Sequence, residues 1–351
     1  MNWDIIGHEW AVDLLRRSIA NQRVAHAYLL SGPASVGKAV LALRMAQALN
    51  CESGGPDPCL ACRTCRRIER GNHPDVRVSG MVAQALGLKP EEAARQKELK
   101  IDTVREWQHD INLRPYEGRQ RVFILHDAER LTDAAANAML KTLEEPPPYA
   151  TIVLVANTAG DLLPTIVSRC QPLKLRPVPR AQIAAALRAR YGLPDGDADL
   201  LAAWSGGRVG WALRMAEAPQ EREAQVAQLE ALIGLATQPR SVGFRWAEDR
   251  AKEYRAGDQA AVFAALELWQ SWWRDVLLTA AGCTEAIVHV DRRNTLTQAA
   301  ARYPIPEVHA FITRLNTAAQ QLRDNVNPQL VFENVVLHLP NARAPGEGRR
   351  A

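Results

Sequence analysis

Apolar and polar residues alternate along the first half of this chain with two different periods. Short runs rich in apolar residues predict strands at residues 27–30, 75–79, 121–125 and 151–156. Longer segments with apolar residues at helical spacing predict helices at residues 38–49, 102–113 and 132–143. Pro146 and the two prolines after it end the last of these helices. Strands that alternate with helices in this way predict an α/β fold, with a parallel sheet covered by helices on both faces.

The pattern changes after about residue 173, where strands cease and helices rich in Ala, Leu and Arg continue nearly to the end. Pro219 and Pro239 bracket a boundary inside this helical part. Farther along, apolar side chains at helical spacing predict one buried helix face, formed by Trp269, Trp272, Trp273 and Val276. We interpret this face as core packing rather than as a surface that stacks on bases. Three domains and a flexible tail are expected, in residues 1–172, 173–240, 241–340 and 341–351.

A phosphate-binding loop lies between the first predicted strand and the helix after it. Gly32, Gly37 and Lys38 fill the pattern G-x-x-x-x-G-K-[S/T]. The glycines let backbone N–H groups curl round a phosphate, and the lysine ammonium reaches the terminal phosphates. Ala39 stands where the pattern requires a hydroxyl to hold Mg²⁺. The sequence therefore keeps the phosphate cradle and lacks one ligand of its metal.

A second metal position follows the predicted strand at 121–125. P-loop enzymes place an acidic pair there, an Asp for Mg²⁺ and a Glu that polarises water. This chain has His126 and Asp127 at those two positions. Imidazole is a poor ligand for Mg²⁺, which prefers oxygen donors. Loss at two separate metal positions predicts a site that binds nucleotide weakly or not at all and does not hydrolyse it.

Two adjacent glutamates, Glu144 and Glu145, follow the helix predicted at 132–143. Paired carboxylates can serve acid–base chemistry, but adjacent residues at a helix end point in different directions. We therefore interpret this pair as structural.

Four of the six cysteines lie close together in the sequence, with the spacing C-x7-C-x2-C-x2-C at Cys51, Cys59, Cys62 and Cys65. Four thiolates can complete a tetrahedral Zn²⁺ shell, and C-x2-C steps suit tight turns that direct successive sulfurs to one point. Such a shell leaves no position for water, so the metal would be structural rather than catalytic. Unligated or redox-active thiols are the alternative.

The composition adds the cellular context. With 351 residues, 47% hydrophobic and 23% charged, the chain resembles a protein of several globular domains. It has no signal peptide and no apolar run of ~18 residues, so we expect the cytoplasm, where thiols stay reduced. Cys170 and Cys283 stand apart from the cluster and are expected to be ordinary buried residues. The formal net charge of +4 permits a nucleic-acid partner without requiring one.

The segment from Leu131 to Pro147, followed by Ser168-Arg169-Cys170, resembles the bacterial clamp-loader branch of the AAA+ superfamily. The residues from Arg23 to Leu30, the four-cysteine insertion and the segment from Asn327 to Leu330 match the same branch. The resemblance implies a AAA+ P-loop domain with a zinc module inserted at about residues 50–74. A small helical lid domain and an all-helical collar domain, through which subunits assemble, are expected after it.

Within this branch, motor subunits of the gamma/tau type keep their Mg²⁺ ligands. Because this chain has lost them, it resembles the delta prime type of subunit. The resemblance gives Arg169, in a motif with Ser168 and Cys170, the role of a finger that enters the ATP site of a neighbouring subunit. A guanidinium is always charged, and its fork matches phosphate oxygens.

The resemblance also assigns two sensor positions. Asn157 falls near sensor 1, where a polar side chain orients water or phosphate. Gly210 stands where the sensor-2 helix usually carries a phosphate-facing Arg, although Arg208 lies nearby.

The expected function is that of a non-hydrolysing subunit in the DNA polymerase III clamp loader, which helps to place the sliding clamp on primed DNA. Its partners would be gamma/tau-type motor subunits and a delta-type subunit, with the clamp and the primer–template DNA bound through the complex. The isolated chain is expected to have no catalysis of its own, although it would belong to the DNA-directed DNA polymerase (nucleotidyltransferase) holoenzyme. The alternatives are an active gamma/tau-like motor ATPase with an unusual metal shell, and a zinc-dependent DNA-binding relative that acts alone.

Overall fold

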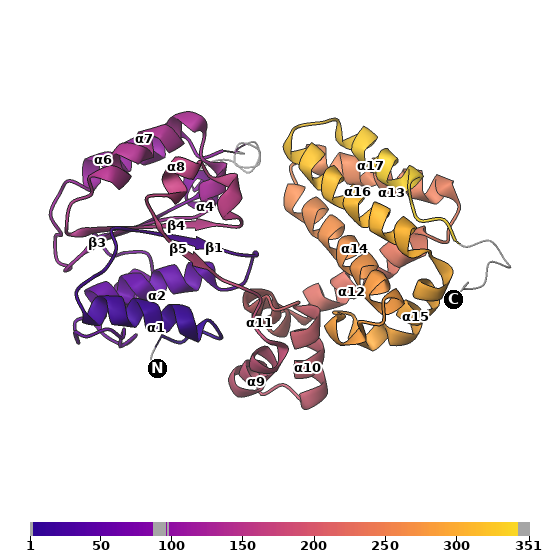
Figure 1. The fold of residues 1–351 in the computed structure, drawn as a ribbon, viewed down its shortest axis with the longest axis horizontal. Helices are drawn as coiled ribbons and strands as arrows, with labels where there is room; N and C mark the ends of the chain where they lie inside the picture. The colour runs from indigo at the N-terminus through magenta and orange to yellow at the C-terminus, as the bar shows by residue number, and fades with distance from the viewer. Residues whose placement is uncertain (1–2, 87–95, 97, 343–351) are drawn as a thin grey trace. The chain divides into compact units, whose positions relative to one another are not determined.

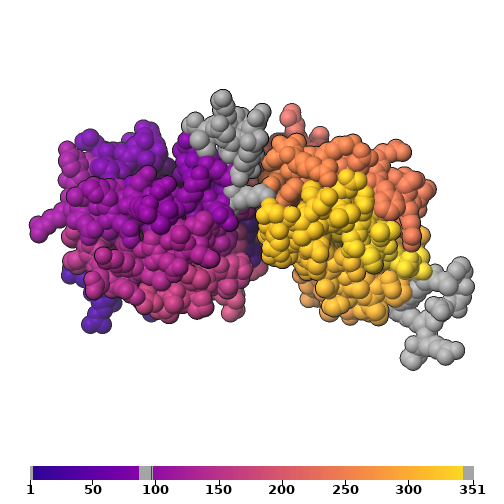
Figure 2. Space-filling view, turned by 90° about the horizontal axis from the view of Figure 1, so that it is seen from above, coloured from indigo at the N-terminus to yellow at the C-terminus, as the bar shows by residue number. Residues whose placement is uncertain are grey.

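The computed structural model describes residues 3–86, 96 and 98–342 (Figure 1). The chain forms two compact units, Met1–Gly192 with Gly207–Leu213, and Leu193–Gly206 with Arg214–Ala351. The colours of Figure 2 follow the chain, so the first unit is mainly indigo to magenta and the second mainly orange to yellow. The tail expected at residues 341–351 lies outside the described residues from position 343 onward.

The first unit contains a five-stranded sheet in the order β2-β3-β4-β1-β5, and each pair of neighbouring strands is parallel. The strands are β1 (Ala27–Ser31), β2 (Val76–Ser79), β3 (Arg121–Leu125), β4 (Ala150–Ala156) and β5 (Gln171–Lys174). The first four confirm the predicted strands within a residue or two. The sequence did not predict β5, because Leu173 is the one buried side chain of this short edge strand.

Helices cover both faces of the sheet. Up to Tyr191 they are α1 (Glu9–Ala20), α2 (Lys38–Asn50), α3 (Arg63–Glu69), α4 (Met81–Ala85), α6 (Ile101–Asp110), α7 (Asp133–Glu144), α8 (Pro164–Val167) and α9 (Arg180–Tyr191). Successive strand residues point to opposite faces. Tyr28 and Leu30 therefore belong to a core with α1 and α2, whereas Ala27 and Leu29 belong to a core with α6 and α7. Figure 1 shows these two helix pairs on opposite faces of the sheet.

The strand order brings three functional segments to one edge of the sheet. β4 lies between β1 and β3, with Ser31 beside Ala156 and Leu125 beside Leu154. The phosphate loop follows β1, His126 follows β3 and Asn157 follows β4. Crevices at the carboxyl ends of parallel strands are where α/β sheets bind ligands. The fold thus assembles the expected nucleotide site from segments far apart in the sequence.

The rest of the chain is helical, as the sequence predicts. Its helices are α10 (Asp195–Trp204), α11 (Val209–Glu217), α12 (Pro219–Leu235), α13 (Arg240–Ala256), α14 (Gln259–Ala280), α15 (Arg293–Arg302), α16 (Ile305–Arg323) and α17 (Pro328–Leu337). The apolar face of α14 is buried, with at most 2% of any side chain exposed at Trp269, Trp272, Trp273 and Val276. This confirms core packing for that face. None of the helices described in the structure has the length and apolar composition needed to cross a bilayer.

Candidate functional site

The loop between β1 and α2 keeps the backbone shape of a phosphate cradle. Gly32 and Gly37 have φ values of 147° and 113°, in the region that favours glycine. A Cβ on Gly32 would lie 2.4 Å from the carbonyl oxygen of Leu175. His8 fixes the loop from outside, because its Nε2 forms a 2.9 Å hydrogen bond with the carbonyl oxygen of Val36. The predicted glycine positions are therefore required by the local geometry.

The Lys38 ammonium has three hydrogen-bond acceptors inside the protein. Its Nζ donates to the carbonyl oxygens of Gly32 at 2.5 Å and Pro33 at 2.8 Å, and to Oδ1 of Asn157 at 3.0 Å. Burial lowers the pKa of Lys38, while the nearby Glu129 and Asp127 favour its charged form. An ammonium has three donors. A phosphate that entered the loop would have to replace one of these bonds.

Asn157 connects Lys38 to an acidic residue, Glu129. Its side-chain Nδ2 donates to Oε1 of Glu129 at 2.7 Å, so its Oδ1 faces the lysine. Oε2 of Glu129 is buried and has no hydrogen-bond partner among the described residues. Asn157 was expected at sensor 1, whereas no role was predicted for Glu129, which lies in the 3-10 turn Ala128–Arg130 after β3. The signal was present in the run His-Asp-Ala-Glu that follows this strand.

Neither of the two metal positions, Ala39 and His126, carries a carboxylate. Ala39 has only a methyl group, and burial lowers the pKa of the His126 imidazole. Asp127 accepts a hydrogen bond from the backbone N–H of Met81 at 3.3 Å. Asp127 has a positive φ of 55°, so the backbone turns sharply after β3. These side chains do not form the oxygen-rich shell that Mg²⁺ needs.

The backbone of Gly210 contacts the phosphate loop at Ser35. Its N–H donates to the carbonyl oxygen of Ser35 at 2.7 Å, and an added Cβ would lie 3.2 Å from that oxygen. The guanidinium of Arg208 lies 5.8 Å from the centre of the Trp211 ring, within the range of a cation–π contact. A backbone amide rather than a guanidinium therefore meets the loop at the expected sensor-2 position.

Arg169 lies directly after α8 and is held by two acceptors. Its Nη1 donates to the carbonyl oxygen of Thr165 at 2.9 Å, and its Nη2 to Oε1 of Glu144 at 2.5 Å. About a third of its side chain is exposed (33%). These bonds are to α7 and α8 rather than to the phosphate loop. Cys170 is buried as expected, and burial raises the pKa of its thiol to about 11.

The four clustered cysteines converge, and all their sulfur atoms lie within 4.8 Å of one another. Backbone N–H groups donate to three of these sulfurs, from Cys59 to Cys51 Sγ, from Cys62 to Cys59 Sγ and from Cys65 to Cys62 Sγ, at 3.2–3.3 Å. The N–H groups of Ala61 and Cys62 lower the pKa of Cys59 to about 6. Four sulfur donors with N–H support fit a tetrahedral metal ion. The cluster can therefore bind a metal ion.

Comparison with known proteins accounts for nearly the whole chain. The family model "DNA polymerase III, delta subunit" matches residues 7–179, and "DNA polymerase III, delta subunit, C terminal" matches residues 253–340. DNA polymerase III subunit delta' of Bacillus subtilis is 30% identical over 326 residues, which cover 93% of this chain and 94% of that protein. The chain belongs to the delta' family of DNA polymerase III subunits. The delta' subunit of Pseudomonas aeruginosa is 37% identical over 209 residues, covering 58% of this chain and 60% of that protein.

Relatives named tau or gamma match between about half and nearly all of this delta' family member. The tau/gamma subunit of Haemophilus influenzae is 33% identical over 185 residues, which cover 52% of this chain and 25% of that protein. Among solved structures, a gamma subunit-related protein of Thermotoga maritima covers 93% of this chain and is itself covered to 98%, with a TM-score of 0.46 and 20% identity.

Two features of this delta' family member differ from or extend the sequence analysis. Cys283 is exposed, so its expected burial was wrong. The residue lies just after α14, immediately before the 3-10 turn Thr284–Ala286. In addition, Asp75 is buried and accepts backbone N–H bonds from Tyr116, Glu117 and Gly118 at 2.7, 2.9 and 2.7 Å.

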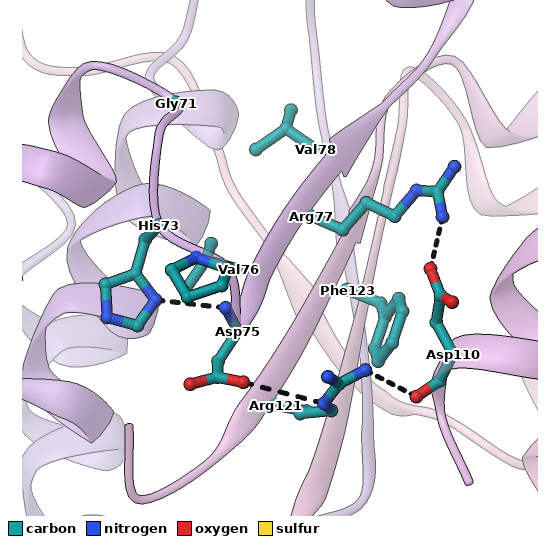
Figure 3. A pocket seen from close by; sticks show the side chains of 10 residues that line it. Gly71, His73, Asp75, Val76, Arg77, Val78, Asp110, Arg121 and Phe123 are labelled. Atoms are coloured by element: carbon teal, nitrogen blue, oxygen red, sulfur yellow. Dashed lines mark hydrogen bonds and ion pairs between the residues drawn. The ribbon is translucent and has the colours of Figure 1, made fainter. Parts of the chain in front are cut away.

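Asp75 lines a depression of about 250 Å³ at the amino ends of β2 and β3 (Figure 3). Burial alone would raise the pKa of Asp75, but the three N–H bonds and the nearby Arg121 together lower it. Arg77 pairs with Asp110, and Arg121 donates to the Asp110 carbonyl oxygen. Since the arginine and aspartate side chains around the depression pair within the protein, we interpret the depression as a structural feature. No local sequence pattern predicts this depression, because the residues that pair around it are far apart along the chain.

Proposed function

We propose that this delta' family member is a non-hydrolysing subunit of a clamp loader. Its single strongest support is the state of Lys38, whose three donors all have acceptors within the protein. Ala39 and His126 remove both metal ligands at the same site, and Gly210 brings no cation to it. Phosphoryl transfer in P-loop proteins depends on Mg²⁺ and on cations that stabilise the transition state. The phosphate loop of this chain lacks the Mg²⁺ ligands and the sensor-2 cation.

The chain contributes instead to the ATP site of a neighbouring motor subunit, to which it presents Arg169. The guanidinium is partly exposed and keeps its charge at any physiological pH. Fingers supplied in trans stabilise transition-state charge on the transferred phosphoryl group and accelerate hydrolysis by about 10³–10⁵-fold. Ser168 and Cys170 fix the short segment that carries the arginine between α8 and β5.

The complex that contains this chain comprises gamma/tau-type motor subunits and a delta-type subunit, and it loads the sliding clamp on primed DNA. The likeness to proteins named tau and gamma, over half of the chain or more, supports this set of partners. Residues 173–240 form the lid domain and residues 241–340 the collar through which the subunits assemble. The chain works in the cytoplasm as a component of the polymerase holoenzyme and catalyses no reaction alone.

The metal of the cysteine cluster is Zn²⁺ in a structural role. Four thiolates suit Zn²⁺ in reducing compartments and leave no coordination position for water. The sulfurs would hold the module between α2 and β2, where Arg119 also donates to the carbonyl oxygen of Cys51.

A gamma/tau-like motor ATPase is the second candidate, favoured by the 33% identity with motor subunits over half of the chain. The two proposals differ in what the purified chain does with ATP. Incubation of the full chain with Mg²⁺ and ATP should give no turnover above background, while a motor subunit in the same assay hydrolyses ATP. Turnover comparable to that motor subunit would overturn the non-hydrolysing proposal.

A further inference from the structure

The finger arginine is bound by a carboxylate from another helix. Glu144 is the last residue of α7, and its Oε1 accepts a hydrogen bond from Nη2 of Arg169 at 2.5 Å. On the other side of the guanidinium, Nη1 donates to the carbonyl oxygen of Thr165 at 2.9 Å. The two bonds attach the guanidinium to both α7 and α8. Its direction is therefore set by two separate elements.

Glu144 stands where a carboxylate is otherwise unfavourable. The carboxyl end of a helix carries partial negative charge, which repels an acidic side chain in the last turn. Pro146 follows two residues later and prevents the helix from continuing. The positive charge of Arg169 offsets the unfavourable position of this carboxylate. From the sequence, Glu144 was expected to be structural, and its contact with Arg169 indicates a more specific role.

The geometry leaves the finger able to bind phosphate. A guanidinium has five N–H groups, and the bonds to Glu144 and Thr165 use two of them. Three remain beyond these contacts within the described part of the chain. We propose that Glu144 is a positioning residue, which holds the Arg169 guanidinium in one direction so that its remaining donors meet the phosphate of the neighbouring subunit. This proposal rests on the finger role proposed above.

The effect of this contact should be modest, because both side chains reach solvent. Arg169 is 33% exposed and Glu144 50% exposed. Exposed ion pairs contribute little, and the upper half of the range measured for them corresponds to about a two- to fivefold change in rate. Holding a flexible arginine in place lowers the entropy that is lost when the transition state forms, and it leaves the affinity for ATP unchanged. The expected change is therefore in kcat, with KM unchanged.

The test compares Glu144→Gln with Glu145→Gln in the reconstituted full complex, with single-turnover ATP hydrolysis as the readout. The neighbouring Glu145 loses the same charge one residue away from the contact. Glu144→Gln should slow the phase that depends on Arg169 by about two- to fivefold, at unchanged KM and unchanged thermal unfolding of the subunit. Glu145→Gln should match the wild type. In an Arg169→Ala background, Glu144→Gln should have no further effect.

Each other outcome overturns the proposal. Wild-type rates for Glu144→Gln would remove the positioning role, and a faster rate would make Glu144 a brake on the finger. An equal loss with and without Arg169 would mean that Glu144 acts through something else. If Arg169→Ala itself leaves hydrolysis unchanged, the finger role fails, and this result is distinct from a failure of Glu144 alone.

Discussion

The side-chain oxygen of Asn157 accepts a 3.0 Å hydrogen bond from the ammonium of Lys38, and its amide nitrogen donates to Glu129. In a nucleotide site, the sensor residue and the loop lysine would both meet the terminal phosphate. In this chain they meet each other. The preserved loop therefore keeps its shape through internal contacts, while the groups that perform hydrolysis are missing. Its lysine is part of the fold, and this leads to the first prediction.

Replacing Lys38 by Ala should destabilise the subunit by about 1–3 kcal/mol, because the carbonyl oxygens of the buried Gly32 and of the exposed Pro33 lose their donor. Urea unfolding of the full chain measures this change. ATP hydrolysis by the reconstituted complex should stay at the wild-type rate. Lys141→Ala, at an exposed helix position, is the control and should change stability by less than about 0.5 kcal/mol. Lost hydrolysis with intact stability would mean that the loop binds nucleotide in function.

The cysteine cluster should hold one metal ion per chain. Cys62→Ser should release zinc, as measured by elemental analysis of the purified protein, and should increase hydrogen exchange around residues 50–74. Cys283→Ser is the matched control, since this cysteine is exposed and lies far along the chain from the cluster. Native protein that carries no zinc after purification without chelators would contradict the proposed metal.

Asp75 should make stability depend on acid pH. Its pKa is lowered below 3.8 in the folded state, so its contribution is fully present above that value and is lost as the pH falls through the folded-state pKa. Asp75→Asn should destabilise the chain by about 1–3 kcal/mol at neutral pH, because the amide keeps only one acceptor oxygen, sets an NH2 donor against the backbone N–H groups and removes the buried charge. Urea unfolding at several pH values should show this difference shrink below about pH 4. A difference that is constant with pH would show that the charge is not responsible.

The parts that the sequence predicts correctly are those encoded by neighbouring residues. The glycines of the loop, the spacing of the cysteines and the apolar runs of β1, β3 and β4 each act within a few positions, so their geometry follows from local pattern. Leu173 gave too weak a signal to predict β5. Cys283 was wrongly expected to be buried, because residue type alone does not tell which turn the core covers.

Long-range pairing was not accessible in the same way. Glu129 meets Asn157 across 28 positions, and Glu144 meets Arg169 across 25. These pairs depend on the order of strands in the sheet and on where α7 ends relative to α8. The sequence identified Asn157 and Arg169 through a family resemblance, but their partners emerged only from the fold. The hydrogen bonds of Arg169 and Lys38 therefore depend on residues that are distant in the sequence, Glu144 for Arg169 and Asn157 for Lys38.

The substitution Arg169→Ala shows whether this chain acts on its neighbour's ATP through Arg169. The assembled complex should form normally by size-exclusion chromatography, because the hydrogen bonds of the guanidinium within the described residues go to Glu144 and Thr165. Single-turnover hydrolysis should lose the phase of one ATP site, slowed by at least about tenfold and by up to 10³–10⁵-fold. Arg169→Lys should restore little, since an ammonium lacks the guanidinium fork. Wild-type hydrolysis by a correctly assembled Arg169→Ala complex would contradict the account.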